Sequence, residues 1–517
     1  MNQYIPDLDN LNPLHVPPIK TVRVNVNIIQ KDDGTGNFED NEDTRERIRQ
    51  VFNWINDFYS SRAPSDPIEW VTELPGYDSR IRFSIGDYGE ERIYFYRNTT
   101  WWNYHYTNSC EPITSYLQTY YPERLENINL FILGNPDWQY NFADAKMPKY
   151  NDFTYDQIVA AYFWRPVSDW ACSMLLAHEF GHTLDLIHTY TGGGTTAICD
   201  QDNPDFLKDI YVTTLPDECN CPHICVYDSN AYAINGDGIT NNLMGGNKQE
   251  MYISPMQAGQ MHRALSLTSA RKYVTCEKSD VPFVIVNEQI WDFDMKLYQD
   301  LIIENGAALT LTCHLVMHPD AKIIVKPGGR LIVDGATIGT DLFENNLWPG
   351  IEVWGDRSTH QYAVNGSYGQ GYVELRNGAT IENAVCALAL WRPGHWGTTG
   401  GIVHAEDAVF RNNHRAVHAL HYRNTHPVSG KETGYNATFT RCQFTVDGNY
   451  PGDGDHVFHK HVDLDHVRGL KFRACDFSVT APSENISQWT SGIAGYEAGF
   501  GVTGLCEKQQ RASLPVV

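Results

Sequence analysis

Residues 178–188 constrain the fold of this chain more than any other segment, because they read His-Glu-Phe-Gly-His-Thr-Leu-Asp-Leu-Ile-His. His178 and His182 are four residues apart, so on a helix both imidazoles lie on one face, one turn from each other. His188 cannot share that face, and the chain must turn back after Leu184 to bring it to the other two. Three histidines and a water are the ligands of a catalytic zinc ion. The segment therefore predicts a helix that ends in a sharp turn beside Zn²⁺.

Glu179 follows the first candidate ligand and is the candidate general base, because from there its carboxylate can reach the open position of the metal and take a proton from water. Ser168 predicts the N-cap of the helix, which we expect over about residues 168–184. The apolar stripe of this helix consists of Cys172, Leu175, Leu176 and Phe180. An amphipathic core helix with incidental histidines is the alternative interpretation, but it leaves the third histidine unexplained.

The motif resembles that of the metzincin metallopeptidases, His-Glu-x-x-His-x-x-Gly-x-x-His followed by a methionine-containing turn beneath the metal. Residues 241–246, Asn-Asn-Leu-Met-Gly-Gly, are similar to that turn and imply that Met244 forms the apolar floor of the site. The distance from His188 to Met244, the helix start at Ser254-Pro255 and the nearby cysteines are most similar to the pappalysin branch. The resemblance covers about residues 20–275. It implies an α/β (α+β) zinc endopeptidase domain that acts on protein or peptide substrates.

Two positions depart from the family pattern. Asp185 stands where the family has glycine, at the point where the chain leaves the helix through a left-handed conformation. Aspartate is one of the few residues that adopt this conformation at moderate cost, so the turn is still expected. Many relatives have a tyrosine two residues after the methionine, where this chain has Gly246, so the role of that tyrosine is unassigned here.

The net charge of −24 argues against a nucleic-acid partner, which needs a basic surface, and against binding to anionic membranes. No apolar run approaches the roughly 20 residues that span a bilayer. The first residues lack the basic and apolar regions of a signal peptide. Either the protein is cytosolic, or its signal peptide is absent from this sequence. The cysteines and the repeats described below favour the second alternative, so we expect a secreted or cell-surface protein.

Five cysteines lie around the predicted methionine turn, and acidic residues lie between His188 and that turn. Disulfide bonds are favoured over a metal site for the cysteines, which are Cys199, Cys219, Cys221, Cys225 and Cys276. Similar peptidases hold calcium near this point, so the candidate Ca²⁺ ligands are Asp200, Asp202 and Asp205. Solvated loop carboxylates are the alternative, because no defined calcium loop is present.

Periodicity divides the chain into an irregular segment at 1–19, the peptidase domain at 20–278 and a third region at 284–517. Within the peptidase domain we expect strands at 21–28, within 81–95 and at 128–133, and helices at 44–61, 113–121 and 168–184. This order is typical of an α/β layer with the metal helix packed under a sheet. A substrate peptide would add to the edge of that sheet, for which residues 92–95 are the candidate.

Residues 284–517 show internal repeats rather than helical periodicity. Asn-Gly-Ala-Ala-Leu-Thr-Leu at 305–311 is similar to Pro-Gly-Gly-Arg-Leu-Ile-Val at 327–333, and Gly-Ala-Thr-Ile occurs at both 335–338 and 378–381. A small residue two positions before phenylalanine recurs at Phe410, Phe444 and Phe477. These patterns predict an all-β, right-handed parallel β-helix, similar to bacterial secreted β-helix domains and truncated at its C-terminus. A β-sandwich remains the alternative.

The β-helix region also contains a histidine-rich segment, residues 414–466, with a polar outer face favoured over a second metal site. Its flat faces suit docking to an extracellular glycan or matrix protein. The rival function is a β-helix adhesin, or a carbohydrate-binding or lyase protein, with a silent peptidase domain. The intact Glu179 argues against it.

Overall fold

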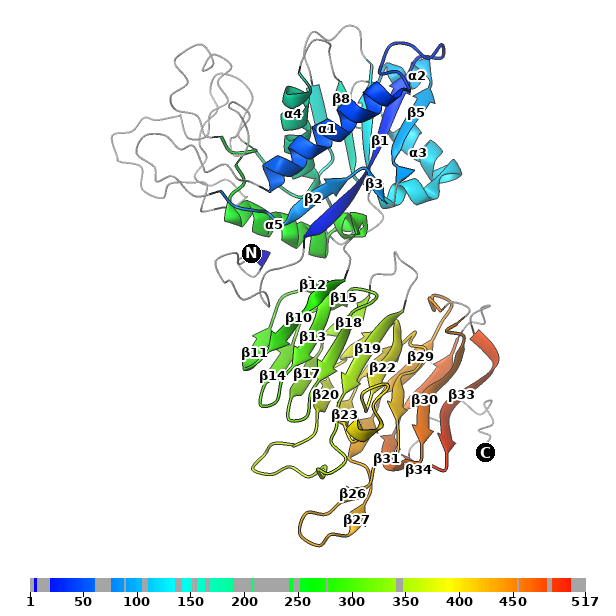
Figure 1. The fold of residues 1–517 in the computed structure, drawn as a ribbon. Coiled ribbons are helices and arrows are strands. Elements are labelled where there is room, and N and C mark those ends of the chain that lie inside the picture. The colour runs from blue at the N-terminus through cyan, green and yellow to red at the C-terminus, as the bar shows by residue number, and fades with distance from the viewer. Residues whose placement is uncertain are drawn as a thin grey trace. The chain divides into compact units, whose positions relative to one another are not determined.

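The computed structural model divides the chain into two compact units, Met1–Cys276 and Glu277–Val517, which are described separately (Figure 1). In the described part of the chain, no helix is long and apolar enough to cross a membrane. The structure describes residues 4–6, 19–60, 76–87, 90–104, 110–134, 142–150, 152, 156–162, 168–188, 207, 241–244, 252–275, 278–340, 347–452, 455–480 and 486–503.

The first unit is built on a mixed sheet in the order β2-β1-β6-β8-β7. Its strands are β1 (Lys20–Gln30), β2 (Ile81–Ser84), β5 (Ile93–Arg97), β6 (Ile128–Leu133), β7 (Phe142–Ala145), β8 (Ile158–Tyr162) and β9 (Val274–Thr275). β1 pairs in parallel with β2, β5 and β6, and β6 pairs in parallel with β8. β7 runs antiparallel to β8 at one edge of this order. A small hairpin joins β3 (Gly86–Asp87) and β4 (Glu90–Glu91).

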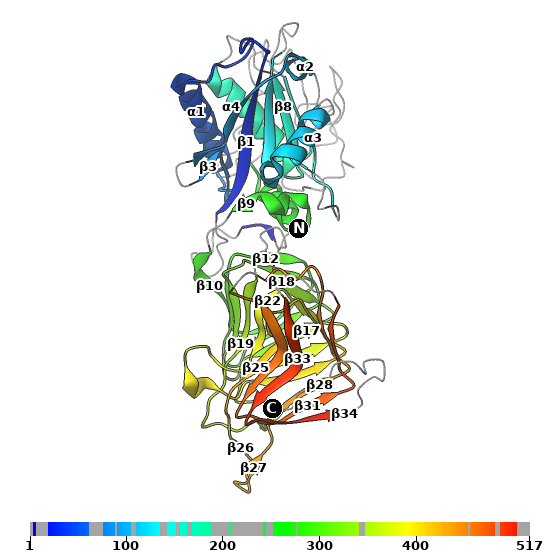
Figure 2. The same ribbon diagram turned by 90° about the vertical axis from the view of Figure 1, so that its right-hand side faces the viewer.

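Helices cover both faces of this sheet (Figure 2). They are α1 (Glu42–Tyr59), α2 (Thr99–Trp102), α3 (Glu111–Tyr120), α4 (Asp169–Thr183) and α5 (Pro255–Leu267), with 3₁₀ turns at Pro122–Glu126 and Ser269–Tyr273. The central strand β6 is buried along its whole length. Phe131 packs with Ile113 and Leu117 of α3, whereas Leu130 and Ile132 face α1 and α4. The two-residue period of a strand thus supplies an apolar side chain to each helical layer.

The three predicted helices begin and end within two residues of those observed, and the predicted strands in this unit correspond to β1, β2, β5 and β6. β7 and β8 were not predicted. Residues 92–95 fall mainly in β5, which lies beside β1 at the edge opposite β7.

The second unit consists of three stacked parallel sheets, and this arrangement confirms the β-helix and rules out the β-sandwich. The first sheet has, in order, β10 (Ser279–Ile285), β13 (Gln299–Ile303), β16 (Lys322–Val325), β19 (Trp348–Val353), β22 (Ala384–Ala389), β25 (Val417–Ala419), β30 (Phe458–Asp465) and β33 (Ile486–Tyr496). The second has β11 (Glu288–Trp291), β14 (Ala308–Leu311), β17 (Arg330–Asp334), β20 (Tyr372–Arg376), β23 (Ile402–Glu406), β28 (Ala437–Thr440), β31 (Arg468–Arg473) and β34 (Gly499–Thr503). The third has β12 (Met295–Leu297), β15 (Leu315–Met317), β18 (Thr337–Thr340), β21 (Thr380–Glu382), β24 (Val409–Arg411), β29 (Gln443–Val446) and β32 (Asp476–Val479). Each coil contributes one strand to successive sheets. The described strands run from β10 (Ser279–Ile285) to β34 (Gly499–Thr503).

The repeats found in the sequence are the interior ladders of this β-helix. Leu309 of β14 (Ala308–Leu311) pairs with Leu331 of β17 (Arg330–Asp334), which confirms the 22-residue repeat. Ile338 pairs with Ile381 in the same way through β18 (Thr337–Thr340) and β21 (Thr380–Glu382). Phe444 stacks between two further phenylalanines, with ring centroids 4.7 Å from Phe410 and 4.6 Å from Phe477.

The turns before the third sheet repeat a left-handed residue. Gly378, Asp407, Arg441 and Ala474 occupy equivalent places in successive coils and have φ values of 81°, 52°, 53° and 51°. The predicted small rung follows each turn. Cys442 and Cys475 are buried at adjacent levels of this ladder, as expected of apolar rungs.

Candidate metal centre

Three histidines from the end of α4 and the turn after it converge on one point. The Nε2 atom of His188 lies 3.0 Å from Nε2 of His178 and 3.1 Å from Nε2 of His182. Among the described residues, no other group of three His, Cys, Asp or Glu side chains comes within ligand distance. The structure therefore brings together the three residues whose spacing predicts a metal site.

Each of the first two imidazoles is oriented by a backbone carbonyl. His178 donates through Nδ1 to the carbonyl oxygen of Leu243 at 2.8 Å, and His182 donates through Nδ1 to that of Leu186 at 2.7 Å. These bonds leave Nε2 as an unprotonated acceptor in both rings. Nitrogen lone pairs that face one another repel unless a cation lies between them. Tetrahedral zinc at 2.0–2.1 Å holds nitrogen ligands roughly 3.3 Å apart, so this donor set fits Zn²⁺.

The site keeps the imidazoles of His182 and His188 neutral. Burial, together with His178 and His188, lowers the pKa of His182 to about 3. Burial and His178 lower the pKa of His188 to about 4. Because a protonated imidazole cannot bind a metal, low pKa values keep protons from competing for these nitrogens near neutral pH.

The turn that delivers His188 is a Schellman motif. Leu186 N–H donates to the Gly181 carbonyl and Asp185 N–H donates to the His182 carbonyl, both at 3.0 Å. Asp185 occupies the left-handed position of the motif, with φ 72°. The sequence predicts this conformation, and the reversal also places the Leu186 carbonyl against His182.

Sequence reasoning missed the partners of Asp185. Its Oδ2 accepts hydrogen bonds from the hydroxyl of Tyr150, at 2.5 Å, and from Nε2 of Gln260. Arg263 donates to the same tyrosine hydroxyl at 2.8 Å and lies over its ring. Burial raises the pKa of the Asp185 carboxyl, and the two hydrogen bonds oppose this shift. Only the family position of residue 185 could have directed attention to it.

Met244 lies against the metal helix and is fully buried. A Cβ added at Gly181 would lie 2.6 Å from Met244 Sδ, so a larger residue at 181 would require the methionine side chain to shift. Met244 N–H donates to Oδ1 of Asn242 at 3.0 Å. The segment predicted to lie beneath the site thus packs on the helix that carries two of the ligands.

Asn242 and Gln257 attach this segment to α5. Each amide donates to the other at 2.9 Å, and both are buried. Gln257 also forms a capping box with Ser254 at the start of α5. Sequence reasoning found the helix start but missed both the capping box, which the Ser-x-x-Gln pattern at 254–257 could have indicated, and the amide pair.

Glu179 is buried on α4 next to His178, with 6% of its surface exposed. The next residue, Phe180, packs against Phe52 of α1 and stacks on Phe83 at 4.7 Å. Tyr59 donates to the Ala177 carbonyl at 2.9 Å. The helix is thus fixed on the side facing α1 and β2.

Several predicted features lie outside the described residues. They are the candidate calcium ligands Asp200, Asp202 and Asp205, and the cysteines expected to form disulfides, Cys199, Cys219, Cys221, Cys225 and Cys276. Among the described residues the free cysteines are Cys110, Cys172, Cys313, Cys386, Cys442 and Cys475. The disulfides therefore stay a prediction.

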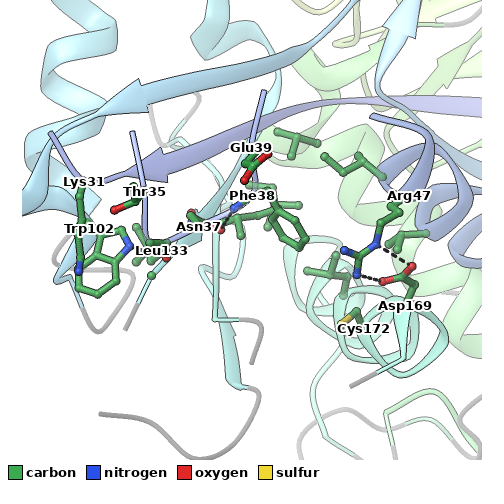
Figure 3. A pocket seen from close by; sticks show the side chains of 18 of the residues that line it. Lys31, Thr35, Asn37, Phe38, Glu39, Arg47, Trp102, Leu133, Asp169 and Cys172 are labelled. Atoms are coloured by element: carbon green, nitrogen blue, oxygen red, sulfur yellow. Dashed lines mark hydrogen bonds and ion pairs between the residues drawn. The ribbon is translucent and has the colours of Figure 1, made fainter. Parts of the chain in front are cut away.

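A separate cavity of about 580 Å³ opens between α1, α4 and the ends of β1 and β6 (Figure 3). Arg47 and Asp169 form a two-bond ion pair in its wall, at 2.6 and 3.1 Å. Lys31 lies over the Trp102 ring at the other end. None of the three histidines lines this cavity, which borders the start of α4 rather than its metal-binding end.

Comparison with known families agrees with the geometry. Residues 157–266 match the M43 peptidase family model, described as pregnancy-associated plasma protein-A. The match includes β8, α4 with the three histidines, and most of α5. No curated protein matches the chain significantly.

Proposed function

Because the chain carries an M43 (pappalysin) metalloendopeptidase domain with its histidine triad, we propose that it hydrolyses peptide bonds with Glu179 as the general base. The observation that carries the proposal is the convergence of three Nε2 atoms, with a buried glutamate directly after the first of the three histidines in the sequence. His178, His182 and His188 would hold the zinc. When bound, zinc supplies Lewis-acid polarisation and lowers the pKa of a water molecule.

Glu179 supplies the proton-transfer chemistry. In this proposal its carboxylate accepts a proton from the attacking water and passes it to the nitrogen of the leaving amine. Leu243 and Leu186 keep two imidazoles in the tautomer with a free Nε2, and Met244 excludes water beneath them.

We propose that a substrate peptide adds to β7. β7 is antiparallel, lies at the edge of the sheet and contacts α4. Among the described strands it pairs with β8 alone, so its other side can receive a peptide strand through main-chain hydrogen bonds. β5, the edge candidate from the sequence, lies on the far side of β1 from β6, β8 and β7.

We also propose that the protein works outside the cell, where the cysteine-rich segment would form disulfides and the β-helix would dock on a glycan or matrix protein. Calcium binding at Asp200, Asp202 and Asp205 belongs to the same proposal. Cysteine usage and the long sheets support these points. Mass mapping of disulfides under non-reducing conditions tests the oxidised state, since free thiols throughout 199–276 would contradict it.

The central test is Glu179→Gln in the full chain. We expect loss of hydrolysis of a quenched peptide with zinc content unchanged, because Glu179 is the base and not a ligand. Glu123→Gln, an exposed change on the 3₁₀ turn, is the matched control and should retain full activity. His188→Ala should instead lose zinc. Near-normal turnover by Glu179→Gln would refute the mechanism.

The rival function, a β-helix adhesin or carbohydrate-binding or lyase protein with a silent peptidase domain, makes the opposite forecast. It expects no zinc-dependent cleavage of casein by the wild-type chain. Cleavage that a chelator stops and added zinc restores would exclude a silent domain.

A further inference from the structure

Asp185 lies in a conformation that aspartate adopts at a cost. Its φ of 72° falls in the left-handed region, where a side chain with a Cβ is disfavoured by roughly 1–2 kcal/mol relative to glycine. Such a residue persists where the surrounding structure stabilises it. The carboxylate therefore has interactions that a glycine at the same place would lack.

These interactions come from two other segments. Tyr150, which follows β7, donates its hydroxyl to Oδ2, and Gln260 of α5 donates to the same oxygen. Arg263 lies one turn further along α5 and donates to the tyrosine hydroxyl at 2.8 Å. Asp185 thus connects the turn after α4 to two other segments, the chain that follows β7 and helix α5.

The same turn determines the orientation of His182 and the position of His188, two of the three candidate ligands. The Leu186 carbonyl orients His182 at 2.7 Å, and His188 follows two residues later. A shift of residue 185 moves both, because the backbone bonds from Asp185 and Leu186 to α4 define where the chain reverses. A metal site is sensitive to such shifts, since partners that orient the ligands commonly change affinity 10–100-fold.

We propose that Asp185 is a positioning residue for the metal site, and that its carboxylate, held by Tyr150 and Gln260, fixes the turn that presents His182 and His188. The proposal rests on the proposed zinc site and goes beyond it, because glycine can form the turn but cannot form the contacts. A residue that merely ended the helix would be replaced by glycine without loss.

The test measures zinc affinity of the full chain by competition with a chromophoric chelator, together with the visible spectrum of the Co²⁺-substituted protein. Asp185→Gly should weaken zinc binding about tenfold and alter the Co²⁺ bands, since orienting partners have effects of this order. Asp185→Asn keeps an acceptor oxygen and tolerates the left-handed conformation, so it should restore most of the affinity. Glycine and asparagine both adopt the left-handed conformation of residue 185, so both variants should fold. The test therefore does not depend on Asp185→Ala, which would strain this backbone.

Tyr150→Phe should weaken zinc binding roughly threefold, in line with the loss of the hydrogen bond from its hydroxyl to Asp185. It should have no further effect in the Asp185→Gly background, because the tyrosine acts through the carboxylate. Tyr120→Phe, an exposed tyrosine on α3, is the matched control and should leave affinity unchanged.

The outcomes separate this proposal from the one it rests on. If the wild-type chain does not bind zinc, the proposed function fails. If the wild type binds zinc and Asp185→Gly binds it equally well with an unchanged Co²⁺ spectrum, the positioning role is overturned. Full additivity of Tyr150→Phe and Asp185→Gly would overturn the coupling between them.

Discussion

Gly181→Ala tests whether Met244 packs on the metal helix as the structure shows. The new Cβ would lie 2.6 Å from Met244 Sδ, about 0.8 Å inside the 3.4 Å at which ordinary contact begins. Met244 is fully buried, so its sulfur cannot move without displacing neighbours. Overpacking of this kind costs about 1–3 kcal/mol.

Alanine also has a higher helix propensity than glycine, which would stabilise α4 by up to about 1 kcal/mol. The net expectation is a destabilisation of about 1 kcal/mol in the free energy of unfolding. Met244→Ala removes the sulfur and with it the clash. In that background the same Gly181→Ala change should stabilise the protein, so the sign of its effect reverses.

Calorimetry of the full chain measures these effects in the unfolding transition that responds to zinc. Each variant is compared with its own parent, so that the large cost of Met244→Ala itself does not enter. If that parent is too unstable, Met244→Val also lacks an atom at the Sδ position. Stabilisation by Gly181→Ala in the wild-type background would show that the methionine does not lie against the helix.

Three further predictions concern metal, pH and the ladder of the second unit. Removing zinc with a chelator should lower the melting temperature of the peptidase unit only, because a ligand at roughly 1,000 times its Kd contributes about 4 kcal/mol; equal shifts in both transitions would contradict this. Burial lowers the pKa of His461 to about 4, below its ordinary value of 6.5, so protonation favours the unfolded state. The stability of the β-helix should therefore fall as pH drops from 6.5 to 4, by up to about 3 kcal/mol, and His461→Gln but not exposed His421→Gln should reduce that loss in urea titrations at several pH values. Phe444→Ala should cost about 3–5 kcal/mol in urea unfolding because it leaves a gap between two stacked rings, whereas a change within about 0.5 kcal/mol is expected for exposed Val428→Ala.

The metal site could be predicted from the sequence because its determinants are local. Helical spacing places His178 and His182 on one face, and the left-handed tendency of residue 185 predicts the reversal that returns His188. The β-helix ladders were predictable for a related reason. Successive coils of a β-helix have apolar residues at the same positions, so the sequence repeats the same apolar pattern at intervals of tens of residues, as at Leu309 and Leu331.

The remainder could not be predicted because its contacts join residues with no periodic relation. Tyr150 meets Asp185 across 35 residues, and Gln260 meets it across 75. β7 (Phe-Ala-Asp-Ala) and β8 (Ile-Val-Ala-Ala-Tyr) each contain two alanines, a residue depleted in strands, so their sequence signal is weak. Their pairing depends on burial against α4 and β6, which appears only when the sheet is assembled.

The orientation of the metal ligands depends on backbone more than on side chains. His178 and His182 both donate to carbonyl oxygens, of Leu243 and Leu186, rather than to carboxylates. A neutral acceptor raises the basicity of an imidazole less than a carboxylate does, so a metal held by such ligands keeps more of its positive charge. A carbonyl can be moved only by moving the chain. The position of Leu243 depends on its backbone hydrogen bond to Tyr252 and on the Asn242–Gln257 amide pair, and that of Leu186 depends on the turn at Asp185. Substitutions at these supporting residues should therefore change metal affinity more than substitutions of either leucine that preserve its buried volume.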